Sequence, residues 1–498
     1  RRNQNLILAR DPVGIKPLHY TVVAGTLVFG SEIKSILRHP LVRPQLNVEA
    51  LDLYLSLEYV PAPHSLYAGI HKLPAGHCLT FHPRTGLNVQ RYWDVSPETR
   101  NWTLGDARDR FRELLHESVG LRMIADVPLG AFLSGGVDSS AVVASMASQS
   151  TRPVETFSIG FEERSYNELP WARKVSGAFG TNHLERVLKP DILDLVELIG
   201  TRLDEPLGDF SNFPTYLVSR TARERVTVSL SGDGGDELFG GYEHYVAQKM
   251  ASQPGMSLAN PWLRLLGRTL PPSPHKKGWV NRIRRYAVGL AFPAEERHFR
   301  WMQFLTEGDR NALYRGDLLD RAGKRKGLQN TQPFGAYLGE ADAFPGLNAD
   351  CFLDVRTYLA DNILTKVDRM SMLCSLEARV PLLDKEMVAF AFSLPPEWKV
   401  RGRTTKWFMK EALEGILPRE VIHRRKEGFS IPMKHWLKGP LRDLMHDLLQ
   451  PGQLRGDGLF DEGCVSRWMR EHLEGKEDHA HRLWALMLFH LWKRNYLP

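Results

Sequence analysis

A glycine-rich turn between an apolar run and a helical run is the first segment of this chain that could do chemistry. The turn reads Ser134-Gly-Gly-Val-Asp-Ser139 and follows the apolar run Leu129–Leu133. A helix start presents unpaired N–H groups and the positive end of the helix dipole, so such a turn can bind phosphate without a dedicated lysine. Gly135 and Gly136 would let the backbone approach a ligand where a Cβ atom would collide, and Asp138 suits a magnesium ion that neutralises phosphate charge. The Gly-Lys-Ser/Thr ending of an ordinary ATPase loop is absent. The alternative is a serine-glycine turn that only caps a helix.

A second turn of this kind carries three acids. It reads Ser231-Gly-Asp-Gly-Gly-Asp-Glu-Leu-Phe-Gly-Gly-Tyr242 and also follows an apolar run. Its glycines expose backbone amides. Asp233, Asp236 and Glu237 form a carboxylate cluster whose members repel one another unless a cation or a polyvalent ligand compensates them. A tight turn with a capped helix would explain the glycines but not all three acids.

Strands alternate with helices around both turns, which predicts an α/β fold with a doubly wound parallel sheet. Because ligands of such sheets bind at the carboxyl ends of the strands, both turns fall where a ligand is expected. From about Tyr245 onward the pattern predicts helical additions. The predicted strands are Leu129–Leu133, Thr156–Phe161, His183–Leu188 and Val226–Leu230, and the predicted helices are Ser139–Ser148, Glu168–Phe179, Ile192–Leu203 and Pro214–Arg223.

The first part of the chain has a different pattern, dominated by short strands and hairpins. A linker is predicted at Ser96–Arg100. The predicted strands are Leu6–Ala9, His19–Val23, Thr26–Gly30, His77–His82 and Leu87–Tyr92, with short helices at Ser31–Arg38 and Val48–Leu57.

The composition is typical of a soluble globular protein. The chain has 498 residues, of which 43% are hydrophobic and 25% charged, and its net charge is +7. This length predicts two or three domains. No apolar run reaches the ~20 residues of a membrane helix, and the basic clusters lack an aromatic-studded sheet pattern, so neither a membrane nor a nucleic acid is expected as a partner. Four dispersed cysteines without a Cys-x-x-Cys pair argue against zinc and disulfides and favour a reducing cytoplasm.

The first turn resembles the pyrophosphate loop of the ATP pyrophosphatases (adenine nucleotide hydrolase-like), which split ATP into AMP and pyrophosphate while adenylating a substrate. Together with the second turn it is similar to the asparagine synthetase family in particular. The resemblance implies that Asp233 would sit beside a β-aspartyl-adenylate, that Asp138 and Asp236 would hold Mg2+ and pyrophosphate, and that Glu237 would bind substrate. The residues that it assigns to ATP are Leu133, Ser134, Gly135, Gly136, Asp138, Ser139, Ile159, Ser231 and Gly232.

Two later segments extend the resemblance. In Tyr358–Met372, Asp361 would approach the amino group of aspartate, and Asp368 would also contact the substrate. The alternative there is an amphipathic helix with a surface ion pair. In His423–Ser430, Lys426 would face the pyrophosphate and stabilise the charge that develops during adenylation. The alternative for this segment is a solvated basic run.

The beginning of the chain resembles the latter part of a class II glutaminase domain, a four-layer α+β sandwich of the Ntn type, on the residues Arg10–Leu18 and Phe29–Lys34. Residues 1–95 are therefore expected to form an incomplete glutaminase domain, and residues 104–498 the synthetase domain. The resemblance implies a cysteine nucleophile at the amino terminus, but the first cysteine here is Cys78. The chain is accordingly expected to be truncated, to use ammonia rather than glutamine, and to expose apolar surface from its partial sandwich.

The expected activity is ATP-dependent amidation of aspartate to asparagine through β-aspartyl-AMP, with ATP and Mg2+ as cofactors. The substrates are aspartate, ATP and ammonia, or glutamine in a full-length enzyme. The alternatives are a paralogous amidotransferase acting on another carboxylate, a β-lactam synthetase relative, and a non-catalytic homologue. The oligomeric state stays open, with a homodimer as one option.

Overall fold

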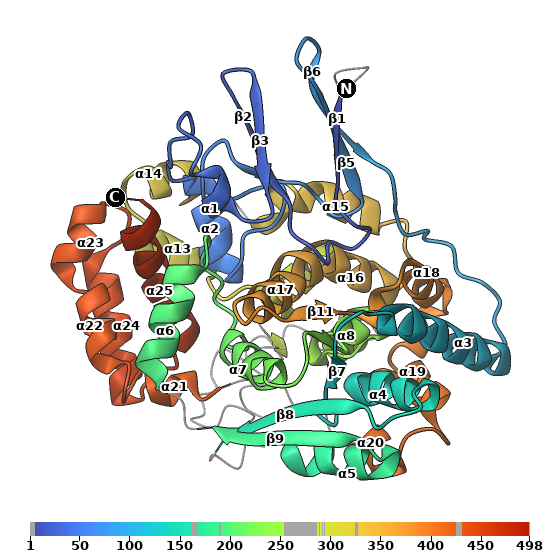
Figure 1. Cartoon of the computed structure of the whole chain (residues 1–498). Helices are drawn as coiled ribbons and strands as arrows, with labels where there is room; N and C mark the ends of the chain where they lie inside the picture. Colours follow the sequence, from blue (N-terminus) through green and yellow to red (C-terminus); the bar gives the residue numbers. More distant parts are fainter. Residues whose placement is uncertain are drawn as a thin grey trace.

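Five parallel strands form a sheet at the centre of the larger part of the molecule (Figure 1). The computed structural model describes residues 5–161, 168–188, 191–252, 286–287, 289–290, 292, 294–323, 327–424 and 431–497. The strand order is β11-β10-β7-β8-β9, formed by β7 Leu129–Phe132, β8 Glu155–Phe161, β9 Asn182–Leu188, β10 Val228–Leu230 and β11 Glu377–Arg379. Of the strands in this sheet, β7, β8, β9 and β10 confirm the four strands that were predicted for it. β11 lies in the region for which only helices were predicted, because a strand of three residues is too short to show a periodic pattern.

The register places the carboxyl ends of β7 and β10 side by side. Val228 pairs with Leu129, and Leu230 pairs with Ala131, in a parallel ladder. On its other side β7 pairs with β8, where Phe132 lies opposite Phe157. The chain therefore leaves β7 and β10 at the same edge of the sheet.

Helices between and beyond the strands pack on this sheet. α4 contacts β7 and α3, α5 contacts β8 and β9, and α7 contacts β8 and α17 (Leu364–Met372). The apolar face of α3 is buried through Phe111, Leu114, Leu115 and Val119. The mixed α/β architecture with a parallel sheet is thus confirmed. The bounds are α3 Leu104–Met123, α4 Val137–Gln149, α5 Leu169–Phe179, α6 Ile192–Arg202, α7 Asn212–Arg223, α8 Gly235–Phe239 and α9 Glu243–Ala251.

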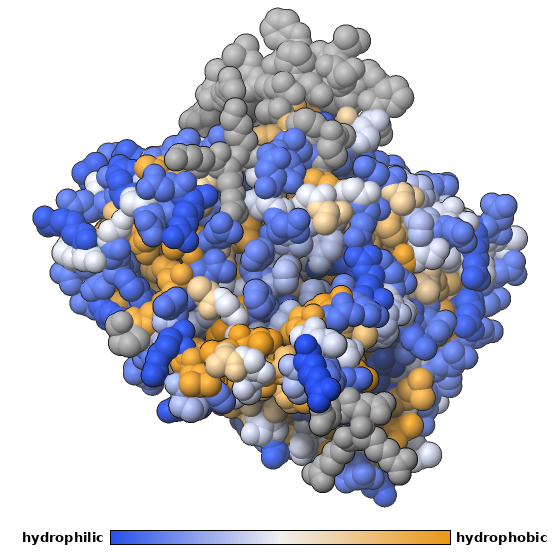
Figure 2. Space-filling view, turned by 90° about the horizontal axis from the view of Figure 1, so that it is seen from above, coloured by the Kyte–Doolittle hydropathy of each residue, from blue (hydrophilic) through white to orange (hydrophobic). Residues whose placement is uncertain are grey.

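The first region folds into two antiparallel sheets of three strands each, with the orders β1-β5-β6 and β3-β2-β4. Several of its apolar side chains face solvent, including Ile7 (67% exposed) and Phe29 (44%). These two sheets lie at the top of the molecule in Figure 1. The view from above shows hydrophobic areas among hydrophilic ones on this face (Figure 2). The elements are β1 Leu6–Ala9, β2 His19–Val23, β3 Thr26–Gly30, α1 Ile33–Ile36, α2 Val48–Leu57, β4 His71–Lys72, β5 His77–His82 and β6 Gly86–Arg91.

Apart from β11, the elements that follow α9 among the described residues are helices, and a π-helix, η4 Val355–Ile363, leads directly into α17. They are α12 Ala294–Met302, α13 Glu307–Leu313, α14 Gly316–Leu318, η2 Leu319–Gly323, η3 Leu328–Asn330, α15 Phe334–Ala341, α16 Leu347–Asp354, α17 Leu364–Met372, η5 Pro381–Leu383, α18 Lys385–Ser393, η6 Pro396–Trp398, α19 Trp407–Leu413, α20 Arg419–Ile422, α21 Met433–Trp436, α22 Arg442–Leu448, α23 Pro451–Asp457, α24 Glu462–Glu474 and α25 Ala480–Tyr496.

The last helix, α25, ties the two parts of the molecule together. The Trp492 indole N–H donates to the Asp204 carbonyl at 2.7 Å, and the Tyr54 hydroxyl of α2 donates to the Ala485 carbonyl at 3.0 Å. One continuous cluster of buried apolar side chains extends from Val13 to Trp492. The first region and the parallel sheet therefore share a core. None of the helices among the described residues has the length and apolar character needed to cross a membrane.

Candidate active site

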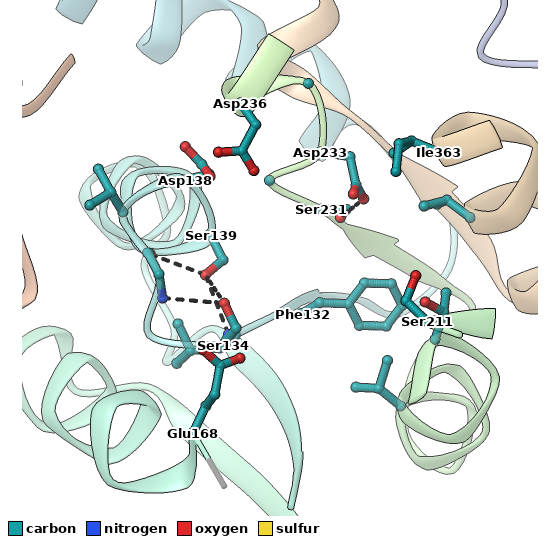
Figure 3. Close-up of a pocket in the computed structure, with 18 of the residues that line it drawn as sticks. Phe132, Ser134, Asp138, Ser139, Glu168, Ser211, Ser231, Asp233, Asp236 and Ile363 are labelled. Carbon is teal, nitrogen blue, oxygen red and sulfur yellow. Dashed lines mark hydrogen bonds between the residues drawn. The ribbon is translucent and has the colours of Figure 1, made fainter. Parts of the chain in front are cut away.

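The two glycine-rich turns meet at one edge of the sheet and line a single pocket of about 390 Å³. A Cβ atom placed on Gly232 would lie only 2.5 Å from the Ser139 backbone nitrogen, so the turns touch. Figure 3 shows Asp138 and Asp236 directed toward one another, with Ser134 and Ser139 beside them. Of the residues assigned to ATP from the sequence, the pocket is lined by Leu133, Ser134, Gly136, Asp138, Ser139, Ile159, Ser231 and Gly232.

Gly135 was expected to contact ATP but is not among the residues that line the pocket. Its φ is +68°, and a Cβ atom would lie 2.5 Å from the backbone carbonyl carbon of Trp171 in α5. The backbone conformation and the close packing against a helix therefore both favour glycine here. At Gly136, where φ is −76°, the nearest contact of an added Cβ would be Ser134 Oγ at 3.2 Å.

Hydrogen bonds within the first turn and from Arg424 outside it stabilise the conformation of this turn. The hydroxyls of Ser134 and Ser139 are 3.0 Å apart, and the Gly136 N–H donates to Ser134 Oγ at 3.2 Å. From outside, the Arg424 guanidinium donates to the carbonyls of Ser134 (3.2 Å) and Gly135 (2.9 Å). The first turn is thus held in shape by its own serines and by a distant arginine.

A buried lysine joins the acids of the two turns. Lys406 Nζ donates to a carboxylate oxygen of Asp138 and lies 2.6 Å from Asp236 Oδ1. Burial lowers the pKa of Lys406, but the attraction of the two carboxylates outweighs burial and raises the pKa above its usual value. Asp138 in α4 and Asp236 in α8, helices that follow different strands, are thus close enough to share one cation. Their hard oxygen donors fit the coordination preference of Mg2+.

Asp233 lies beside Ser231 in the second turn and lines the same pocket. Ser231 Oγ donates to its carboxylate, as Figure 3 shows. Burial raises the pKa of Asp233, the charge of Lys366 lowers it, and the nearby acids Asp236 and Asp209 raise it, so that the pKa lies above its usual value. A carboxylate in this state is a stronger base than an ordinary aspartate.

The far side of the pocket holds a second buried lysine. Lys366 Nζ donates to Asp209 Oδ2 at 3.1 Å and to Ser211 Oγ at 2.7 Å. Tyr358 lines the pocket beside them, and the pKa of its hydroxyl is raised by burial and by the charges of Asp209 and Glu237. Glu237 also lines the pocket, although only 1% of it is exposed, and it accepts a hydrogen bond from the hydroxyl of Tyr242.

Asp361 and Asp368 do not reach the pocket. Asp361 accepts a hydrogen bond from the Ala62 N–H at 2.7 Å and lies 3.8 Å from Arg10, beside a smaller cavity against the first region. Asp368 forms an ion pair with Lys16 at 2.8 Å. The helical path from η4 into α17 turns both acids toward the first region, whereas Lys366 lies on another face and lines the pocket. Asp368 is thus buried and paired with the first region, which differs from the alternative of a surface ion pair on an amphipathic helix.

Lys426 lies outside the described residues, so its predicted role stays a prediction. Arg424, two positions earlier, is described, and 5% of its side chain is exposed. It stacks over Trp171 at 5.3 Å as well as binding the first turn.

The sequence analysis did not single out several polar residues that line this pocket. Lys406 follows Arg401 and Arg403 in a basic run that reads as a solvated loop. Asp209 and Ser211 follow a predicted helix without any glycine-rich signal. These residues lie near the turns only because of the tertiary fold. The one signal in the sequence was that both turns follow the carboxyl ends of strands, where charged residues from other segments are expected to gather.

Comparisons with known proteins agree with this geometry. A family model described as asparagine synthase matches residues 110–494, and one described as glutamine amidotransferase domain matches residues 1–93. Asparagine synthetase [glutamine-hydrolyzing] 1 of Bacillus subtilis is 30% identical, in an alignment that covers 98% of this chain and 76% of that protein. Asparagine synthetase [glutamine-hydrolyzing] 3 of the same organism is 29% identical over 99% of this chain and 77% of its own length. An amidase of Penicillium rubens is 26% identical over 92% of this chain and 72% of its own length. The chain therefore belongs to the asparagine synthase family.

Proposed function

We propose that this chain is a carbon–nitrogen ligase that amidates aspartate to asparagine with ATP, through β-aspartyl-AMP. The observation that carries the proposal is the meeting of the two turns, whose acids converge on Lys406 in one pocket. One ATP molecule can touch both turns there. The proposal includes the doubly wound fold of the ATP pyrophosphatases and a division into residues 1–95 and 104–498.

Two parts of the pocket take different parts of the reaction. The phosphate end comprises Ser134, Asp138, Ser139, Asp236 and Lys406. The acyl end comprises Asp209, Ser211, Asp233, Tyr358 and Lys366. Figure 3 supports this division, because Ser231 and Asp233 lie between Ser211 on one side and Asp138 on the other.

At the phosphate end, backbone N–H groups at the start of α4 bind phosphate oxygens. Lys406 supplies a preorganised positive charge as negative charge develops on the leaving pyrophosphate. Asp138 and Asp236 would hold Mg2+, which neutralises phosphate charge when bound. Lys426 is proposed to face the same pyrophosphate.

At the acyl end, an oxygen of the substrate carboxylate attacks the α-phosphorus, and the bond to pyrophosphate breaks. The nitrogen of ammonia then attacks the acyl carbon, and AMP leaves with the oxygen that formed the mixed anhydride. The two steps replace one difficult displacement by two easier ones. Asp233, whose pKa is raised by burial, accepts a proton that the attacking nitrogen loses.

Ammonia is proposed as the nitrogen donor for this 498-residue chain. Burial raises the pKa of Cys351 to about 12 and that of Cys374 to about 11, so these two thiols are poor sources of thiolate. We expect ammonium to support asparagine formation and glutamine not to replace it.

The test is an assay with ATP, Mg2+ and ammonium, with and without aspartate, in which AMP and asparagine are measured. Release of AMP that requires aspartate supports the proposal. AMP release that requires a different acid assigns the chain to a paralogous amidotransferase, and no nucleotide turnover identifies a non-catalytic homologue. Asparagine made from glutamine alone would overturn the proposed nitrogen source.

A further inference from the structure

The acyl end contains an ion pair at the wall of the pocket rather than in the packed core. The side chains of Lys366 and Asp209 are 8% and 16% exposed, and both line the pocket together with Ser211. A buried ion pair is weak evidence for a stabilising role, because desolvation offsets much of the attraction between the charges. Its position at the pocket wall instead makes both charges accessible to a ligand.

Each member of the pair has a hydrogen bond left to offer. The Lys366 ammonium has three N–H groups, and among the described residues it donates to Asp209 and Ser211. Asp209 Oδ1 accepts from the backbone N–H (2.8 Å) and the hydroxyl (2.6 Å) of Ser211, while Oδ2 accepts only from Lys366 among the described residues. A donor with positive charge and an acceptor with negative charge are therefore adjacent. This arrangement is complementary to the carboxylate and the ammonium of a zwitterion.

Neighbouring groups limit the size and orientation of such a ligand. The Tyr358 ring lies 5.9 Å from the Tyr242 ring, centroid to centroid, and both rings line the pocket. In the view of Figure 3, Asp233 lies between Ser211, which accepts from Lys366, and Asp138 of the first turn. A ligand held at Lys366 and Asp209 can thus extend a short side chain past Asp233 toward the phosphate end.

We propose that Lys366 binds the α-carboxylate and Asp209 the α-ammonium of an amino-acid substrate, so that its side-chain carboxylate is presented for adenylation. This inference rests on the proposed function and deepens it. It assigns the choice of an α-amino acid over a simple carboxylic acid to two residues. It also places the recognition of the amino group on Asp209 rather than on Asp361.

The test compares three acids that differ by one charged group. Aspartate has both groups, β-alanine lacks the α-carboxylate, and succinate lacks the ammonium. The full chain and its Lys366→Met and Asp209→Asn variants are assayed with ATP and ammonium, and the two analogues are measured as substrates or as competitive inhibitors.

Lys366→Met should weaken aspartate binding about 10- to 100-fold and leave the binding of β-alanine unchanged, because only aspartate has the group that the lysine binds. Asp209→Asn should weaken aspartate to a similar extent and leave succinate unchanged. The KM for ATP should not change in either variant.

Two further variants keep the test decisive. The double variant Asp209→Asn/Lys366→Met leaves no single buried charge, so it should fold even if a single variant does not, and it should still bind aspartate weakly. Lys16→Met breaks the ion pair that α17 forms outside the pocket, and it should leave the KM for aspartate unchanged. The inference is overturned if the double variant binds aspartate like the wild type, if the losses are equal for all three acids, or if the KM for ATP rises instead. If the wild-type chain releases no AMP with any acid, the proposed function fails and the inference fails with it.

Discussion

The two ends of the pocket each contain a buried lysine, but the two lysines are paired differently. Lys406 faces two carboxylates, Asp138 and Asp236, whereas Lys366 faces one carboxylate and one hydroxyl. The phosphate end therefore keeps a surplus of negative charge after its lysine is counted, which suits a second cation. At the acyl end Lys366 forms an ion pair with Asp209, and each of the two retains a hydrogen bond for a ligand. The charge of Lys366 also lowers the pKa of Asp233, but the carboxylate of Asp233 accepts its hydrogen bond from Ser231. The number of direct ion pairs that each buried lysine forms, two for Lys406 and one for Lys366 among the described residues, thus separates a cation-binding end from an end suited to a zwitterion.

The two ends are also supported by different parts of the chain. The phosphate end is built from β7, β10 and the turns that follow them, with Arg424 behind the first turn. The acyl end depends on the first region: the Gly208 N–H, next to Asp209, donates to the Glu58 carbonyl at 2.7 Å. A Cβ atom on Gly208 would lie 2.7 Å from Glu58 Cβ, so this contact is close. Substitutions at the two ends should therefore have separable effects.

The largest effect is expected at Asp233, which lies between the two ends. Asp233→Asn should reduce AMP release about 10²- to 10⁴-fold, because a general base is lost from the step in which ammonia attacks. Aspartate-dependent exchange of pyrophosphate with ATP should fall less, since that exchange needs only the adenylation step. If both activities fell equally, Asp233 would not act specifically in the second step. If AMP release stayed near normal, Asp233 would have no role in the reaction.

Lys406→Met should reduce AMP release and pyrophosphate exchange together, by about 10²- to 10³-fold, because a preorganised charge at the leaving group is lost. The KM for aspartate should change little, in contrast to Lys366→Met. Lys385→Met, at an exposed position at the start of α18, is the matched control. A variant of Lys406 that loses affinity for aspartate but keeps its exchange activity would contradict the division into two ends.

Glu58, which contacts the segment beside Asp209, should make the free energy of unfolding depend on pH. Burial raises the pKa of Glu58 from 4.5 to about 7, although His481 opposes this shift. The folded chain then holds a proton that the unfolded chain releases between pH 4.5 and 7, so the free energy of unfolding should fall as the pH rises through this range, by at most about 3 kcal/mol. Glu58→Gln should remove this dependence in urea unfolding measured at several pH values. An unchanged slope would assign the pH dependence to other groups.

The smallest effects are expected from alanine at the two glycines of the first turn. Gly135→Ala should lower the free energy of unfolding by about 1–3 kcal/mol, because a positive φ is strained for alanine and its Cβ would meet α5. Gly136→Ala, at an ordinary φ, should cost about 1 kcal/mol or less. Thermal unfolding of the two variants measures the difference. Equal destabilisation would mean that the conformation of Gly135 is not what requires glycine.

Local patterns in the sequence were sufficient for most of the strands and for both turns. Apolar runs marked β7 and β8, since a buried parallel strand is apolar on both faces. β9 is a partly exposed edge strand that contains Glu185 and Arg186, so its apolar signal is weaker. β11 and β4, with three and two residues, were missed because such short strands carry no periodicity. Asp361 was expected near the substrate but faces the first region, because sequence spacing does not reveal how a helix is rotated in the fold.

By itself the sequence determined the order of strands and helices, the two turns and the acids within them, because these features depend on neighbouring residues. Only the tertiary structure decided that Lys406 joins Asp138 to Asp236 and that Lys366 meets Asp209. The members of these pairs are separated by between 157 and 268 residues along the chain. Charge pairing over such separations follows from the packing of the whole core, and no local pattern encodes it.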